Sequence, residues 1–233
     1  MSDGIARIVS DTVAGPDPLS HLSQLVDQAA AFAEVVLKDV SSREPPPKPI
    51  ACKKGCAFCC HGREVHATSL EVLRIAGYVA ENFPIDQIGA LLTRAAEVEQ
   101  AKKEQWNAGP PRRNFRCPLL VDNVCSVYPV RPLVCRGFNS YDAYACELQK
   151  SFLQENAKIE GYAHQGRAAQ AALAGLRRGL DEAGLGADVL DLAPALRIVL
   201  TTQNVAPRWL SGEPVFEGAR ARIDRDKEGS PAA

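Results

Sequence analysis

The sequence predicts a mainly α-helical single domain with an irregular, cysteine-rich metal-binding centre. Apolar residues recur at helical spacing in segments on both sides of the centre. No alternation of strand and helix patterns appears, which argues against a parallel sheet or barrel. All eight cysteines lie between residues 52 and 146, in a stretch without clear periodicity. The centre is therefore expected to be organised by its thiols.

Length and composition limit the classes of protein to consider. The chain has 233 residues, 46% of them hydrophobic, so it can bury a core without covalent crosslinks. Its 27 basic and 28 acidic residues give a net charge of -1, which indicates neither a nucleic-acid surface nor an anionic membrane partner. The N-terminus has no signal pattern, and charges or prolines interrupt every apolar run. We predict a cytoplasmic protein with an unidentified protein or small-molecule partner.

Capping and proline signals predict the elements of the N-terminal part. Residues 1–16 are expected to be a disordered lead-in. A first helix is predicted over 18–41, with Asp17 as its N-cap and Pro18 in its first turn. The proline run at 45–49 excludes helix and predicts an extended connector.

Two further helices precede the second half of the centre. Thr68 is expected to begin the first of them, with Glu71 completing a capping box, and this helix should end near Asn82. Another helix is predicted over 85–107. Short strand pieces are plausible around Val124–Tyr128.

The C-terminal part again has helical patterns. Helices are predicted over 160–183, with Gly184 as the stop, and over 187–203. The helical domain is thus expected to span 17–212 and to contain the cysteine region 50–150. Residues 213–233 are polar and are expected to form a flexible tail.

The cysteines form two groups. The first is Cys52, Cys56, Cys59 and Cys60, and the second is Cys117, Cys125, Cys135 and Cys146. Because cytosolic thiols stay reduced, this content favours metal over disulfides. Thiolates are the ligands that zinc and iron–sulfur clusters prefer, and short gaps let several sulfurs converge. Gaps of seven, nine and ten residues in the second group do not match a zinc finger, but they suit a pocket that closes over a centre.

The coordination pattern stays open at this point. The eight thiolates either split into two four-coordinate sites, each using both groups, or one centre takes three or four of them. Adjacent side chains usually point apart, so Cys59 and Cys60 are expected either to serve different sites or to divide, with Cys60 packing as a small hydrophobe.

Charged residues near the second group are candidates for binding a cofactor. Arg131 and Arg136 flank Cys135 and are predicted to recognise an anionic group or to compensate thiolate charge, with a surface ion pair as the alternative. His61 and His66 follow the first group, but eight available thiols make a structural role the better interpretation for them.

The cysteine pattern resembles the CxxCxxCC, or YkgJ-type, family of zinc- or iron-chelating cysteine-cluster proteins. The matching positions run Cys52-x3-Cys56-x2-Cys59-Cys60, Cys117-Pro-x-Leu, Cys125-x2-Tyr128-x2-Arg131-Pro132-x2-Cys135-Arg136-x-Phe138 and Cys146-Glu147. The first gap is three residues where the family's name has two. The resemblance covers about residues 50–150 and implies that all eight cysteines bind metal. Some relatives are similar to flagellin lysine N-methylases, although this chain is short for such an enzyme.

Three functions are compatible with the pattern, and no catalytic residue is assigned. The first is an iron–sulfur or zinc protein that transfers electrons or modifies a protein or small molecule. The second is a non-catalytic, zinc-stapled interaction module. The third is an S-adenosylmethionine-dependent enzyme, either methylase-like or radical. Cys52-x3-Cys56-x2-Cys59 is similar to the radical-enzyme motif, but no strand precedes it and no strand–helix repeat follows.

Overall fold

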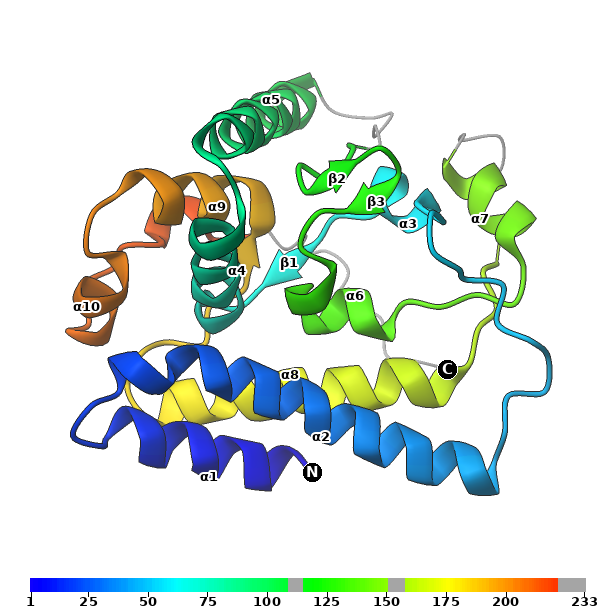
Figure 1. Cartoon of the computed structure of the whole chain (residues 1–233), viewed down its shortest axis with the longest axis horizontal. Coiled ribbons are helices and arrows are strands. Elements are labelled where there is room, and N and C mark those ends of the chain that lie inside the picture. Colours follow the sequence, from blue (N-terminus) through cyan, green and yellow to red (C-terminus); the bar gives the residue numbers. More distant parts are fainter. Residues whose placement is uncertain (109–114, 151–157, 222–233) are drawn as a thin grey trace.

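The computed structural model describes residues 1–108, 115–150 and 158–221 (Figure 1). Within these ranges the fold is mainly helical, as predicted. The α-helices are α1 (Ser2–Val13), α2 (Leu22–Arg43), α3 (Phe58–Gly62), α4 (Ser69–Asn82), α5 (Ile85–Ala108), α6 (Leu133–Gly137), α7 (Ala143–Lys150), α8 (Ala163–Glu182), α9 (Leu192–Thr201) and α10 (Val205–Leu210). Short 3-10 turns are η1 (Leu19–His21), η2 (Tyr128–Val130) and η3 (Glu217–Ala219).

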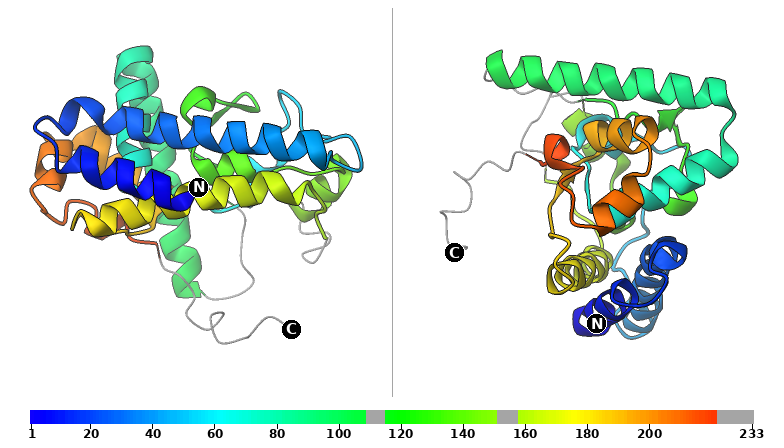
Figure 2. Two further views of the ribbon diagram at one scale, coloured as in Figure 1. Left: turned by 90° about the horizontal axis from the view of Figure 1, so that it is seen from below. Right: turned by 90° about the vertical axis from the view of Figure 1, so that its left-hand side faces the viewer.

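The elements form two layers. Helices α1, α2 and α8 lie side by side as one layer, seen at the bottom of Figure 1 and from below in Figure 2. Helices α4, α5, α9 and α10 lie over one end of that layer, and the cysteine-bearing segments lie over the other. Apolar side chains fill the space between the layers, among them the fully buried Leu70, Ile75, Leu176 and Leu196. This core holds the cysteine region against α8 through α6.

The prediction of a disordered lead-in at residues 1–16 was wrong. Residues 2–13 are the helix α1, which buries Ile5 and Val9 against α8. The cause is a pair of glycines one helical turn apart in α8. A Cβ at Gly175 would meet Ser2 O at 2.8 Å, and one at Gly179 would meet Ala6 O at 2.5 Å. The missing side chains let the two backbones approach closely, which buries even a short amphipathic helix.

The start of the next helix also differs from the prediction. Helix α2 begins at Leu22, after the 3-10 turn η1, and its N-cap is His21. Asp17 is therefore not the N-cap. Its carbonyl instead accepts a hydrogen bond from the Ser20 hydroxyl at 3.2 Å.

The capping box of α4 is confirmed. Thr68 is the N-cap, its hydroxyl accepts from the Glu71 N–H, and the Glu71 carboxylate accepts from the Thr68 N–H. The predicted helix 85–107 corresponds to α5, and the predicted helix 160–183 corresponds to α8. Gly184 follows α8 with a φ of 73°, a conformation that glycine adopts without strain.

Strands are short and antiparallel. β2 (Leu120–Val121) pairs with β3 (Val124–Cys125) through a two-residue turn, and Asp122 and Asn123 both have positive φ. That turn matches the right-handed strand twist and suits these residue types. β1 (His66–Ala67) pairs with β4 (Leu190–Asp191), which joins the end of the first cysteine group to the C-terminal part.

The predicted C-terminal boundaries need two corrections. The segment 187–203 is not helical throughout, because β4 precedes α9 and Asp191 caps that helix. Residues 213–221 are not a flexible tail, since Phe216 and Ala219 are buried and Arg220 bridges to Leu190. The rest of the expected tail, 222–233, lies outside the described residues. Within the described part, no helix has the length and apolarity to cross a membrane.

Candidate metal centre

The fold brings the two cysteine groups to one end of the molecule. Cys52 and Cys56 lie on the loop before α3, and α3 carries the next two cysteines, Cys59 and Cys60. The second group supplies one cysteine before the hairpin, one on β3, one on α6 and one on α7: Cys117, Cys125, Cys135 and Cys146. All eight are free thiols.

Two backbone hydrogen bonds tie the groups together. The N–H of Cys117 donates to the carbonyl of Cys60 at 2.7 Å, and the N–H of Ala51 donates to Ser140 O at 2.8 Å. Helix α3 also packs against α7, which carries Cys146. Residues separated by more than 50 positions in the sequence are thereby fixed next to each other.

Four thiols form a set that we call the inner thiols: Cys60, Cys117, Cys125 and Cys135. Burial raises the pKa of Cys117 to about 11 and that of Cys135 well above its usual range. Repulsion from neighbouring thiolates adds to this shift, with Cys125 acting on Cys117 and both of these acting on Cys135. These sulfurs are therefore close enough for their charges to interact.

The outer thiols are Cys52, Cys56 and Cys146. They line one cleft together with Cys59. Burial is the largest cause of the raised pKa of Cys52, and repulsion from Cys56 and Cys146 contributes. Each of the two sets thus draws on both cysteine groups of the sequence.

Cys59 lies between the sets and interacts with both. The Cys60 thiol donates a hydrogen bond to the Cys59 sulfur, which lowers the pKa of Cys59 to about 6 and raises that of Cys60. The nearby guanidinium of Arg63 lowers the pKa of Cys59 further. The two adjacent thiols thus interact with each other, and their use by different metal sites stays a prediction.

The thiols fit zinc or an iron–sulfur cluster in donor type and in neighbourhood. Zinc and iron–sulfur clusters both prefer thiolate ligands, and each cysteine must lose its proton to bind either of them. Among the described residues, however, no three His, Cys, Asp or Glu side chains converge closely enough to hold a metal ion as placed. Binding therefore requires rotation of side chains, and the assignment of all eight cysteines as ligands stays a prediction.

The two predicted cofactor-binding arginines are engaged within the fold. Arg131 stacks on the Tyr128 ring at 3.8 Å and donates to the Tyr128 carbonyl at 3.3 Å. Its charge lowers the pKa of Cys125, although burial of that thiol has the larger, opposite effect. Arg136 donates to Glu34 on α2 at 2.9 Å and to Pro129 O at 2.6 Å. Arg131 is thus near a thiol, whereas Arg136 fastens α6 to α2.

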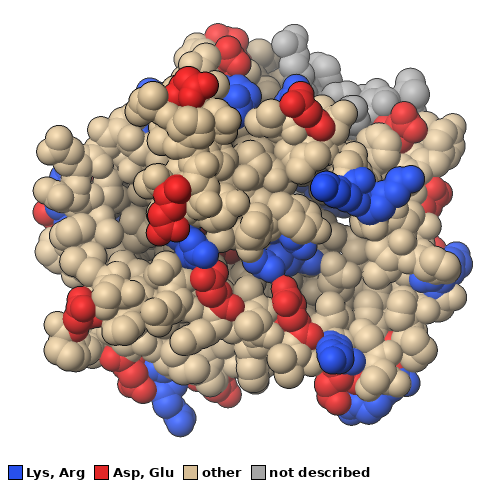
Figure 3. All heavy atoms as spheres, viewed as in Figure 1, with Lys and Arg blue, Asp and Glu red and all other residues tan. Residues whose placement is uncertain are grey.

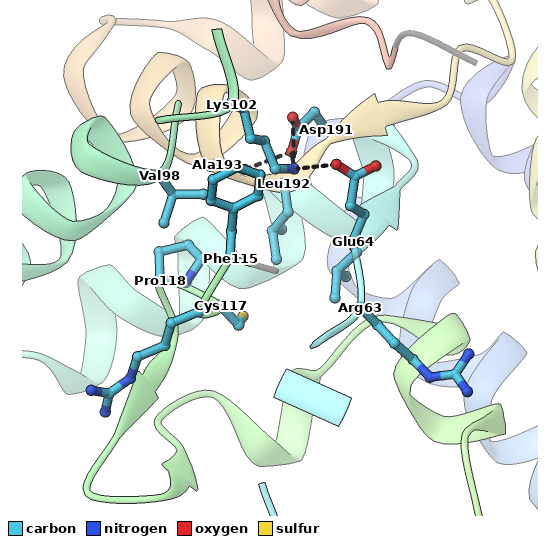
Figure 4. Close-up of a pocket in the computed structure, with 12 residues that line it drawn as sticks. Arg63, Glu64, Val98, Lys102, Phe115, Cys117, Pro118, Asp191, Leu192 and Ala193 are labelled. Atoms are coloured by element: carbon cyan, nitrogen blue, oxygen red, sulfur yellow. Dashed lines mark hydrogen bonds and ion pairs between the residues drawn. The ribbon is translucent and has the colours of Figure 1, made fainter. Parts of the chain in front are cut away.

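Two cations that the sequence did not single out lie beside the thiols. Lys102 on α5 contacts Asp191 at 2.9 Å and Glu64 at 3.7 Å, in a small cleft that has Cys117 in its wall (Figure 4). Arg63 follows α3 and stacks on Phe138, with its guanidinium 4.6 Å from the ring centre. Neither residue belongs to the cysteine pattern, and only the folded chain brings them to the thiols.

The surface over this region carries charges of both signs. On the face shown in Figure 3, acidic and basic side chains alternate over short distances. Charge on that face is therefore not gathered into a patch of one sign.

The cysteine region is similar to one family of known proteins. No curated protein and no solved structure matches the chain. Residues 51–160 match the model of the CxxCxxCC family, whose description is "Putative zinc- or iron-chelating domain". This span contains all eight cysteines and the elements that carry them. The cysteine-bearing segment 51–160 of this chain is thus similar to the CxxCxxCC family.

Proposed function

We propose that this protein holds two thiolate centres for zinc or an iron–sulfur cluster, a structural inner one and a functional outer one. The inner centre would use the four inner thiols. The outer centre would use the three outer thiols and Cys59. The observation that carries the proposal is the 2.7 Å hydrogen bond from the Cys117 N–H to the Cys60 carbonyl, because it fixes the two cysteine groups to each other.

Burial of the inner thiols supports a metal there. A buried thiol resists ionisation, and several thiolates in one place repel each other, which the raised pKa values of Cys117 and Cys135 reflect. A bound cation would offset both effects, since metal ligands bind as thiolates and release their protons. Zinc would supply a rigid crosslink, and an iron–sulfur cluster would in addition accept and donate an electron.

The position of the outer thiols supports the functional role. They border one cleft together, and Cys52 is exposed, whereas of the inner thiols Cys117 lines the other cleft. Electron transfer, or modification of a second molecule, would therefore take place at the outer centre. A radical-enzyme barrel receives no support, since the described ranges contain two antiparallel strand pairs and no parallel sheet.

One observation favours a second function, a zinc-stapled interaction module. Beside the inner thiol Cys125, the hairpin and the turn η2 that follows it expose apolar side chains: Val121 and Val124 are each 39% exposed and Tyr128 is 56% exposed. An exposed apolar surface of this kind suits protein contact. In this case both centres would be structural.

Elemental analysis and a visible spectrum on protein purified without oxygen test the proposal. Iron with acid-labile sulfide and a visible band that bleaches on reduction would support the redox function. Colourless protein with zinc would support the interaction module.

Two cysteine variants test whether there are two centres. Cys117→Ser should deplete one centre and Cys146→Ser the other, so each variant should keep about half of the metal if both centres are mononuclear. Metal-free protein, or unchanged metal in both variants, would contradict two centres.

A further inference from the structure

The cleft of the outer thiols is larger than a metal ion needs. The centres of water-sized spheres can occupy about 50 Å³ of it, a few times the space that one water molecule needs, and the cleft is open on one side. Thiols form one part of its wall, and Phe58, Phe138 and Ile159 supply apolar surface on the others. The wall of the cleft is thus partly thiol and partly apolar.

Arg63 supplies the charge in this cleft. Its guanidinium stacks on the Phe138 ring at 4.6 Å. Stacking uses the face of the guanidinium and leaves the N–H groups at its edge available. In the described part of the chain Arg63 forms no ion pair with an Asp or Glu, whereas Arg74, Arg136 and Arg197 each pair with a carboxylate. An arginine with a fixed plane and available donors is suited to bind an anion.

The direction of Arg63 agrees with this role. Arg63 lies in the wall between the two clefts. Figure 4 shows its guanidinium pointing away from Glu64 and Asp191, whose carboxylates face Lys102. Lys102 thus pairs with the carboxylates of Glu64 and Asp191 in the cleft that Cys117 lines. The Arg63 guanidinium remains for the cleft of the outer thiols.

We propose that this cleft binds a small organic oxyanion, with the carboxylate or phosphate on Arg63 and an apolar body against Phe58 and Ile159. A planar guanidinium can donate two parallel hydrogen bonds to either oxyanion. The position of the site beside the outer thiols makes the ligand the substrate or effector of the outer centre. This last step rests on the proposed function, whereas the binding itself does not.

Binding of matched probes to the purified, metal-bearing protein tests the site. The probes are benzoate, phenyl phosphate and the neutral benzamide, titrated by calorimetry. We expect at least one anion to bind at least tenfold more tightly than benzamide, and the better anion identifies the oxyanion. Equal affinity for benzamide, or no binding of either anion, would overturn the proposal. Since these comparisons use the unmodified protein, they stand even if a variant fails to fold.

Variants of two arginines give the second test. Arg63→Gln should weaken binding of the anion at least tenfold, and Arg63→Lys should weaken it less because charge remains without the planar fork. The control is Arg208→Gln on α10, which pairs with Glu213 far from the cleft and should leave affinity unchanged. Metal content is measured in each sample. Loss of metal in Arg63→Gln would mean that Arg63 compensates the centre and would overturn the anion site. If purified wild-type protein contains no metal but still binds the anion, only the metal proposal is contradicted.

Discussion

The Leu133 N–H donates a hydrogen bond of 2.7 Å to the Glu71 carboxylate, across 62 positions of sequence. The same carboxylate accepts from the Thr68 N–H at 2.8 Å and from the Thr68 hydroxyl at 3.0 Å. One buried side chain, 2% exposed, thus joins the first turns of α4 and α6. Because α6 carries Cys135, Glu71 fixes one inner thiol relative to the helical core.

We predict that Glu71→Gln destabilises the protein, because it replaces an oxygen that accepts a hydrogen bond. All three partners of the carboxylate donate hydrogen bonds, so a glutamine NH₂ would face a donor. Leaving one such buried group unsatisfied costs about 1–3 kcal/mol in free energy of unfolding. Urea denaturation measures this loss, and Glu81→Gln at an exposed position of α4 is the matched control. An equally stable Glu71→Gln protein would show that the network contributes little.

The titration of Glu71 should also be visible in the pH dependence of stability. Burial raises the pKa of its carboxyl group, against the hydrogen bonds from Thr68 and Leu133, which lower it. The folded state therefore binds this proton more tightly than the unfolded chain, where glutamate has a pKa of about 4.3. Its contribution to stability is fully present below that pH and is lost as pH rises through the folded pKa. The excess stability of wild type over Glu71→Gln should shrink as pH rises from 4 to 7. Growth of that excess with pH would contradict the raised pKa.

Close packing of α1 on α8 predicts opposite effects for two glycine substitutions. Gly179→Ala places a methyl group 2.5 Å from both Ala6 O and Val9 Cβ, so α1 must shift, at a cost of about 1–3 kcal/mol. Gly89→Ala in α5 meets nothing within 4 Å and should stabilise by about 0.5–1 kcal/mol, since alanine favours helix. Denaturation curves with limited proteolysis of α1 report both. A stabilised Gly179→Ala protein would mean that α1 does not need this approach.

These glycines also show why the sequence predicted some elements and not others. The capping box of α4 was predictable because Thr68 and Glu71 interact locally, three residues apart. The helix α1 was missed because its stability depends on Gly175 and Gly179, more than 160 positions away. The C-terminal segment at 213–221 was missed for the same reason, since it is ordered by pairing with β4.

At the candidate site, too, local sequence predicted some residues and missed those that only the fold brings together. The cysteine pattern predicted the family and the grouping of thiols, because that information lies in the order of residues. It did not predict Arg63 or Lys102, which reach the thiols only through the packing of α3 and α5. Conversely, Arg131 and Arg136 lie in the motif, but the fold uses them for contacts with Tyr128 and Glu34.

In metal-free protein Cys59 should be the most reactive thiol. Its pKa is lowered to about 6 by the hydrogen bond from Cys60 and by the charge of Arg63, so it is mostly thiolate at pH 7. Burial holds the pKa of Cys117 at about 11, which keeps that thiol unreactive. Alkylation by iodoacetamide, followed by peptide mass spectrometry, should show Cys59 modified first, with a midpoint near pH 6. In Cys60→Ala the midpoint should rise. First modification at Cys117 would contradict this order.

Metal removal should loosen one half of α8 and leave the other half intact. The cysteine region rests on the N-terminal half of this helix, where a Cβ at Gly137 of α6 would meet Ala169 Cβ at 3.0 Å. The C-terminal half is held by α1 at Gly175 and Gly179 instead. If metal organises the cysteine region, chelation removes the contact of α6 and not that of α1. Hydrogen exchange of the chelated protein should rise in α3, in the hairpin and in residues 163–170, and stay low in residues 173–182. Added zinc should restore protection if the metal is zinc. A uniform loss along α8 would show that the metal stabilises the whole fold, and no loss would show that the cysteine region folds without it.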